Sequence, residues 1–62
     1  MYSIEIVYPN GTTKQINMSD YAASITVAQN IFSFSGVPPK LVRVWDFGVN
    51  NDQNHNIWED SR

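Results

Sequence analysis

The sequence predicts a small α+β protein: strand, strand, helix, strand, strand, with one helix packed on one face of a sheet of three or four strands. Three observations lead to this prediction. Residues 19–36 carry apolar residues at helical spacing, residues 2–8 and 12–18 alternate around a turn, and residues 40–47 carry apolar residues on both faces. The chain has 62 residues, which is the length of a single domain, residues 1–62.

The first two strands are expected to form a hairpin closed by Pro9, Asn10 and Gly11. A two-residue loop would place the apolar residues of the two strands on opposite faces, whereas a three-residue loop brings them to the same face. Pro9 and Asn10 suit the centre of a type I turn, and Gly11 suits the left-handed position that follows it. The resulting register pairs Tyr8 with Thr12, Ile6 with Lys14, Ile4 with Ile16 and Tyr2 with Met18.

The helix is predicted to begin at Ser19 or Asp20 and to end at Gly36. The Ser19 hydroxyl can accept a hydrogen bond from a free backbone N–H, and the Asp20 carboxylate suits the positive end of the helix dipole. Gly36 can adopt the left-handed conformation that ends many helices. The apolar side is broad enough to cover a sheet. It consists of a stripe of Tyr21, Ile25, Ala28 and Phe32, flanked by Ile31, with Val27, Phe34 and Ala23 further round.

The third strand, residues 40–47, is expected inside the sheet because both of its faces carry apolar side chains. Val42 and Val44 share one face, which we assign to the helix. If this strand lies beside residues 2–8, we expect the two strands to run parallel, because the helix then acts as a crossover connection.

The C-terminal part is predicted to hold a loop and one more strand. Residues 48–54 are rich in asparagine, which is typical of a loop. Residues 55–59 are expected to form a short edge strand with Ile57 and Trp58 on opposite faces. Residues 60–62 are expected to fray.

The opening of the chain resembles that of ubiquitin-like β-grasp domains. The resemblance rests on the N-terminal hairpin, a helix that opens near Ser19 and Asp20, and the run SGVPPK leading into a strand at residues 35–44. It covers roughly residues 1–46 and implies a β-grasp-like sheet. The chain lacks a C-terminal diglycine, so the resemblance implies no conjugation to other proteins.

Composition argues against several classes of function. The net charge is −2 and the four basic residues are spread along the chain, which disfavours nucleic-acid binding. No cysteine is present and His55 is the one histidine, so we expect no metal or other cofactor. The apolar runs are too short to span a membrane. The absence of cysteine is compatible with a cytoplasmic location.

We expect no catalytic activity. His55 is the one ordinary base, and no supporting set of catalytic residues accompanies it. Oxygen-rich side chains gather in residues 50–54, but without the spacing of an EF-hand loop, so a solvated loop is the better interpretation. The carboxylates considered with them are Asp46, Asp52, Glu59 and Asp60.

The candidate site is a protein-binding cluster of Arg43, Trp45, Phe47 and Trp58. The first three share one face of residues 40–47, and arginine and tryptophan are the residues most enriched at binding hot spots. If the valines pack under the helix, this cluster lies on the face of the sheet that the helix leaves free. The alternative interpretation is that Trp45 faces the helix and fills the core.

We therefore expect a small non-catalytic protein that binds another protein through its helix-free sheet face or an open sheet edge. A regulator or inhibitor of a host enzyme, of the kind that phages and mobile elements encode, fits this description. Two alternatives stay open: a structural subunit of a homo-oligomer and a nucleic-acid-binding sheet. A second candidate surface, for a partner or a second copy, is the helix flank of Ala23, Val27 and Phe34.

Overall fold

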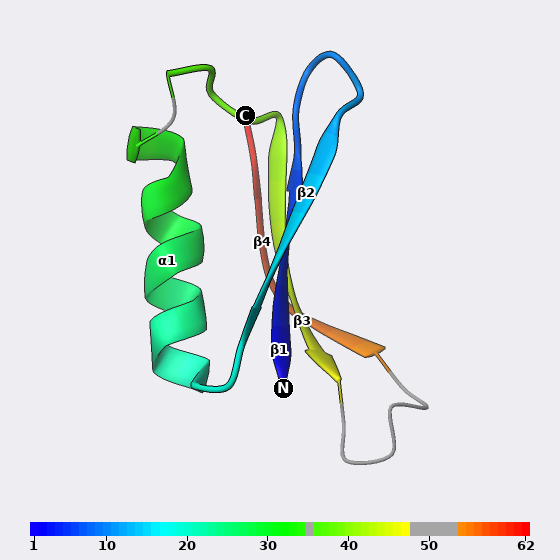
Figure 1. The fold of residues 1–62 in the computed structure, drawn as a ribbon, viewed down its shortest axis with the longest axis vertical. Coiled ribbons are helices and arrows are strands. Elements are labelled where there is room, and N and C mark those ends of the chain that lie inside the picture. The colour runs from blue at the N-terminus through cyan, green and yellow to red at the C-terminus, as the bar shows by residue number, and fades with distance from the viewer. Residues whose placement is uncertain (35, 48–53) are drawn as a thin grey trace.

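The protein consists of one helix packed on a four-stranded sheet (Figure 1). The structure, a computed structural model, describes residues 1–34, 36–47 and 54–62, without the side chains of Phe34 and Asn54. The predicted α+β class and the predicted order of elements are confirmed. The elements are β1 (Tyr2–Val7), β2 (Thr13–Met18), α1 (Tyr21–Phe34), β3 (Leu41–Phe47) and β4 (Asn54–Ser61).

The strands are ordered β2-β1-β3-β4, and each neighbouring pair is antiparallel. The expected parallel pairing of β1 and β3 is therefore wrong. With 14 residues, α1 is about 21 Å long, and it carries the chain back along the sheet to the end where β2 began (Figure 1). β3 starts from that end and runs in the direction of β2, opposite to β1. The likeness to β-grasp domains is thus confined to the order of the elements.

The β1–β2 hairpin has the predicted three-residue loop. The Tyr8 N–H donates to the Thr12 carbonyl at 2.8 Å, and the Gly11 N–H donates to the Tyr8 carbonyl at 2.9 Å. Gly11 has a φ of 90°, the left-handed conformation that glycine adopts without strain. The Asn10 side chain closes the turn by accepting from the Thr12 N–H at 2.9 Å. The strand register is the predicted one, with Tyr2 opposite Met18, Ile4 opposite Ile16 and Ile6 opposite Lys14.

The start of α1 is capped by Asp20 rather than Ser19. The Asp20 Oδ2 accepts from the Ala23 N–H at 2.7 Å, which satisfies one of the free N–H groups of the first turn. The predicted left-handed Gly36 is wrong, because Gly11 is the one glycine with a positive φ in the described part of the chain. The helix ends earlier, at Phe34.

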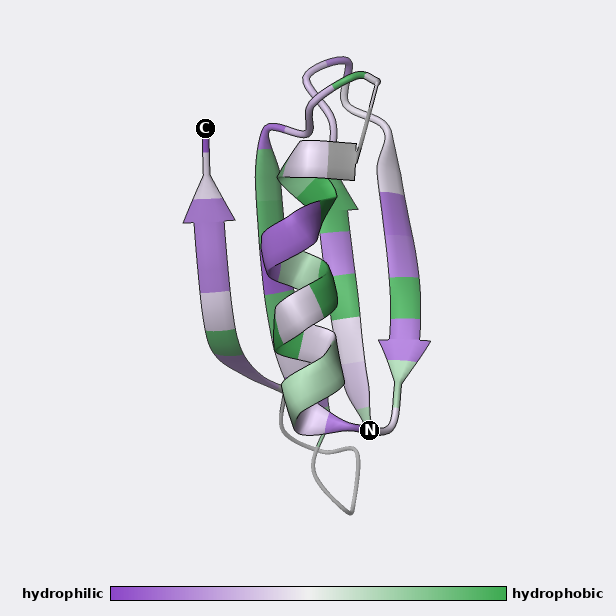
Figure 2. Cartoon of the chain, turned by 90° about the vertical axis from the view of Figure 1, so that its left-hand side faces the viewer, coloured by the Kyte–Doolittle hydropathy of each residue, from purple (hydrophilic) through white to green (hydrophobic). Residues whose placement is uncertain are grey.

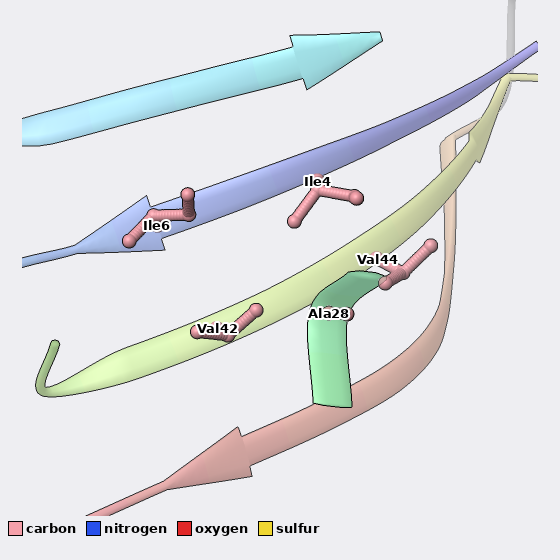
Figure 3. Close-up of a cluster of buried hydrophobic side chains, with 5 residues drawn as sticks. All are labelled: Ile4, Ile6, Ala28, Val42 and Val44. Carbon is pink, nitrogen blue, oxygen red and sulfur yellow. The ribbon is translucent and has the colours of Figure 1, made fainter. Parts of the chain in front are cut away.

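The core lies between α1 and the two central strands (Figure 3). Ile4 and Ile6 of β1 and Val42 and Val44 of β3 point at the helix, as predicted, and each is at most 4% exposed. Ala28 meets them from α1, and its small side chain lets the helix approach the sheet closely. The side chains packed around this core are Tyr2, Tyr8, Met18, Ile25, Val27, Ile31, Phe32, Ile57 and Trp58.

The buried face of α1 is rotated slightly from the predicted stripe. Ser24, which the apolar pattern does not mark, is fully buried, and its hydroxyl donates to the Tyr21 carbonyl at 2.7 Å. Tyr21, predicted as one member of the stripe, is 53% exposed. Its ring meets the Tyr2 ring edge-on, with centroids 5.6 Å apart, at the rim of the core.

β4 is longer than predicted and its end does not fray. The Arg62 N–H donates to the Lys40 carbonyl at 2.9 Å, and the Arg62 guanidinium carbon lies 4.5 Å from the centroid of the Phe32 ring. The register of β3 and β4 shifts between Val44 and Trp45. The extra residue of this β-bulge places Ile57 and Trp58 together against the core, so their predicted placement on opposite faces is wrong.

Candidate functional site

Strand alternation gives the sheet a second face, pointing away from α1. Because Ile4, Ile6, Val42 and Val44 point at the helix, the residues between them point the other way. Figure 1 shows the sheet edge-on with α1, the one helix that the structure describes, on the opposite side. We call this surface the helix-free face. Its residues are Ser3, Glu5 and Val7 of β1, Thr13, Gln15 and Asn17 of β2, Leu41, Arg43, Trp45 and Phe47 of β3, and Asn56, Glu59 and Ser61 of β4.

Trp45 is held in place on the helix-free face by contacts with its neighbours. Its indole Nε1–H donates to the Glu5 Oε1 at 3.1 Å. The guanidinium carbon of Arg43 lies 6.0 Å from the centroid of its ring, within range of a cation–π contact. Across the strand pair Trp45 faces Ser3, which is fully buried and accepts from the Gln15 side-chain amide at 2.5 Å. These contacts fix the orientation of the indole before any partner arrives.

Arg43 lies between two carboxylates on the neighbouring strands. Its Nε is 3.8 Å from the Glu5 Oε1 and 3.5 Å from the Glu59 Oε1. The three side chains are 35% to 53% exposed, so each ion pair contributes at most about 1 kcal/mol to stability. The Arg43 Nε is itself buried without a hydrogen bond. Glu5, Arg43 and Glu59 therefore form a row with one positive and two negative charges. The ion pairs serve mainly to orient these three side chains.

An open hollow of about 480 Å³ lies on this face beside Trp45. One carboxylate, one hydroxyl, one amide and two aromatic rings line it. This mixture of rings and hydrogen-bonding groups suits a side chain of a partner protein better than a purely apolar ligand. The lining residues are Glu5, Thr13, Lys14, Gln15, Trp45 and Phe47.

The structure brings together three of the four predicted site residues. Arg43, Trp45 and Phe47 all belong to the helix-free face, and the two rings are half-buried. Trp58 lies on the helix side of the sheet, opposite Val44, and packs against the core. The bulge in β4 separates it from the others. The alternative interpretation, in which Trp45 faces the helix, does not agree with the strand alternation.

The other candidate surfaces offer less. Ala23 and Val27 are half-buried and Val27 packs against the core, while the Phe34 side chain lies outside the described residues. Residues 50–53, considered for cation binding, lie outside them as well. His55 is exposed in β4, opposite Asp46. Within the described residues, no group of three or more His, Cys, Asp or Glu side chains could hold a metal ion, and no helix is long and apolar enough to cross a membrane.

Glu5, Ser3 and Gln15 are the site residues that the sequence did not predict. Each lies next to an apolar residue of an alternating strand, so the face of the sheet on which it lies was predictable. The side chains that it contacts from other strands were not. The contact between Glu5 and Trp45 joins residues 40 positions apart, and it depends on β3 lying antiparallel beside β1. Comparison with protein-family models, with curated proteins and with solved structures finds no match to the chain.

Proposed function

We propose that this protein is a non-catalytic protein-binding module whose contact surface is the helix-free face, centred on Trp45 and Phe47. One observation carries the proposal: the indole of Trp45 is fixed by Glu5 and Arg43 on the face of the sheet that α1 leaves uncovered. A ring in that position contributes nothing to the packing of the helix. Tryptophan and arginine are the side chains that most often dominate binding energy at protein interfaces.

The preorganised side chains favour binding. Ordering a flexible side chain on association costs about 0.5–1.5 kcal/mol. The hydrogen bond to Glu5 and the stacked Arg43 have already restricted Trp45 in the free protein. The neighbouring hollow beside Phe47 offers a place for a side chain of the partner. Less of the favourable contact energy is therefore lost to ordering these side chains when a partner binds.

We extend the proposal to a regulator or inhibitor that covers the surface of a larger enzyme, of the kind that phages and mobile elements encode. A surface of fixed rings and hydrogen-bonding groups supports such a role. We assign the binding to the cytoplasm on the absence of cysteine.

The experiment that tests this function uses the immobilised protein as bait in a lysate of the source cells, followed by titration of the purified captured protein. Trp45→Ala should weaken the affinity about 30-fold or more, as expected for a hot spot of 2 kcal/mol or greater. Phe47→Ala should weaken it by a smaller factor. Asn30→Ala, on the exposed side of α1, is the matched control and should leave the affinity unchanged.

Circular dichroism of each variant separates loss of the surface from loss of the fold. The proposal is wrong if Trp45→Ala stays folded and binds the captured protein as tightly as the wild type. It is also wrong if Asn30→Ala weakens binding as much as Trp45→Ala, because the contact surface would then include the helix.

A further inference from the structure

β2 is an edge of the sheet with free backbone groups. It pairs with β1 on one side and with no other described strand. The hydrogen bond from the Tyr8 N–H to the Thr12 carbonyl shows which residues of β2 direct their backbone groups toward β1. Every second residue after Thr12 therefore bonds to β1, and the residues between direct their N–H and C=O groups outward. The outward residues are Thr13, Gln15 and Asn17.

This edge has few of the features by which proteins prevent strand pairing. Such features include prolines, bulges and charged side chains along the edge. β2 contains no proline, keeps a continuous register with β1, and carries Lys14 as its one charge. The Lys14 ammonium lies 5.9 Å from the centroid of the Tyr8 ring, above its own hairpin. The opposite edge, β4, has a bulge and the charged Glu59 and Asp60, and the strand at that edge ends in a hydrophilic stretch (Figure 2).

The sequence of β2 is complementary to itself. In an antiparallel pair with its symmetry axis at Gln15, every outward N–H and C=O of the two strands finds a partner. On the helix-free face Gln15 meets the partner's Gln15, and Thr13 meets the partner's Asn17, all without charge. On the helix side Lys14 lies opposite the partner's Ile16. Ile16 is 39% exposed in the single chain, and the aliphatic stem of a lysine can cover it.

We propose that two copies of this chain associate through β2, antiparallel and with the two-fold axis at Gln15, to form one continuous sheet of eight strands. A second copy is favoured over a foreign strand because this register places no like charges directly opposite one another and needs no additional sequence. The pairing leaves Trp45 uncovered on each copy, but it brings the second copy beside Thr13 and Gln15, which also line the hollow next to Trp45. The two α1 helices lie on the same side of the joined sheet.

The test is the mass in solution of wild type and Gln15→Lys by sedimentation velocity from micromolar to millimolar concentration. In the single chain, position 15 lies opposite Glu5, so a lysine there gains an opposite charge that offsets the lost hydrogen bond from the Gln15 amide to the Ser3 hydroxyl. In the pair, two lysines meet at the axis. Wild type should approach twice the mass of the chain, and Gln15→Lys should raise the dimer Kd about tenfold at low salt, with recovery at high salt.

The matched control is Asn56→Lys, the same change of charge on the same face at the other edge. It should leave the dimer Kd unchanged. Hydrogen exchange provides a second readout, since the amides of Thr13, Gln15 and Asn17 should become protected as concentration rises. If Gln15→Lys fails to fold, Asn17→Pro removes an outward N–H without removing a bond to β1, and it should abolish pairing. A wild type that stays monomeric to millimolar concentration overturns the proposal, as does an equal effect of Asn56→Lys.

Discussion

The two faces of the sheet have different compositions although the same strands supply both. The helix side presents Ile4, Ile6, Val42 and Val44, all buried under α1. The residues between them present rings and charges, with Trp45 bonded to Glu5. Neighbouring positions of one strand therefore have different tasks: one set holds the fold and the other forms a surface. A substitution on the helix side should therefore lower mainly the stability of the fold. A substitution at the next residue, on the helix-free face, should lower mainly the affinity for a partner.

The two tryptophans illustrate this difference. Trp58 and Trp45 are both half-buried and belong to adjacent strands. Trp58 packs against the core on the helix side of the sheet, whereas Trp45 contacts charged side chains on the helix-free face. A similar degree of burial can thus accompany a structural role on one face and the binding role that we propose on the other.

The largest loss of stability should follow from creating a cavity on the helix side of β1. Ile4→Ala removes a fully buried side chain at the centre of the core and should lower the free energy of unfolding by about 2–5 kcal/mol. A domain of this size has about 3–9 kcal/mol in total, so the variant should be largely unfolded at 37 °C.

Val7→Ala is the matched control, because Val7 lies on the helix-free face of the same strand and is half-buried. It should lower the free energy of unfolding by about 1 kcal/mol, in line with partial loss of apolar burial. Urea unfolding followed by circular dichroism measures both. Equal losses of unfolding free energy for Ile4→Ala and Val7→Ala would show that the two faces of β1 contribute equally to stability, contrary to the account.

Trp58→Ala should have the second largest effect. Removing the ring leaves a void between β4 and the core, and we expect a loss of about 2–4 kcal/mol, somewhat below that of a fully buried tryptophan. Trp58→Phe should retain at least half of that stability. Chemical unfolding of both variants checks the placement, and a Trp58→Ala protein as stable as the wild type would place this ring outside the core.

Asp20→Ala should weaken the attachment of α1 without touching the helix-free face. The substitution leaves the Ala23 N–H without its acceptor, and the loss of such an N-cap lowers stability by about 1 kcal/mol. Ser19→Ala, one residue earlier, should change it by a few tenths of that value. Thermal unfolding compares the two, and a larger effect at Ser19 would restore Ser19 as the cap.

Arg43→Gln should have the smallest effect on stability. It leaves Glu5 and Glu59 without the cation between them, and exposed pairs of this kind contribute at most about 1 kcal/mol. The loss should shrink as salt rises, because salt screens exposed charges. Lys40→Gln removes the same charge where the structure describes no side-chain ion pair, and should show no such salt dependence. A salt-independent loss at Arg43 would indicate a packing role instead.

Local patterns in the sequence predicted the faces and the hairpin correctly. The alternation of β1 and β3 identified the side that meets the helix, and the run Pro9-Asn10-Gly11 identified the loop and the register. These features depend on residues close together in the chain, where the period of the side chains and the turn chemistry decide the outcome.

The incorrect predictions concern contacts between distant segments. The direction of β3 depends on how far α1 carries the chain along the sheet, which no local pattern encodes. The bulge that turns Trp58 to the core arises from the pairing of β4 with β3. For the same reason the sequence predicted Trp45 and Arg43 but not their partner Glu5, which comes from the other end of the chain.

The most direct test of the difference between the two faces is the free energy of unfolding of Trp45→Ala, measured by urea titration. If the helix-free face serves as a surface, the variant should unfold cooperatively and lose about 1.5 kcal/mol, the lower end of the range for a hydrogen bond to a charged group, because this bond is only partly buried. A loss as large as that of Trp58→Ala would contradict the account, because Trp45 would then be part of what holds the fold together.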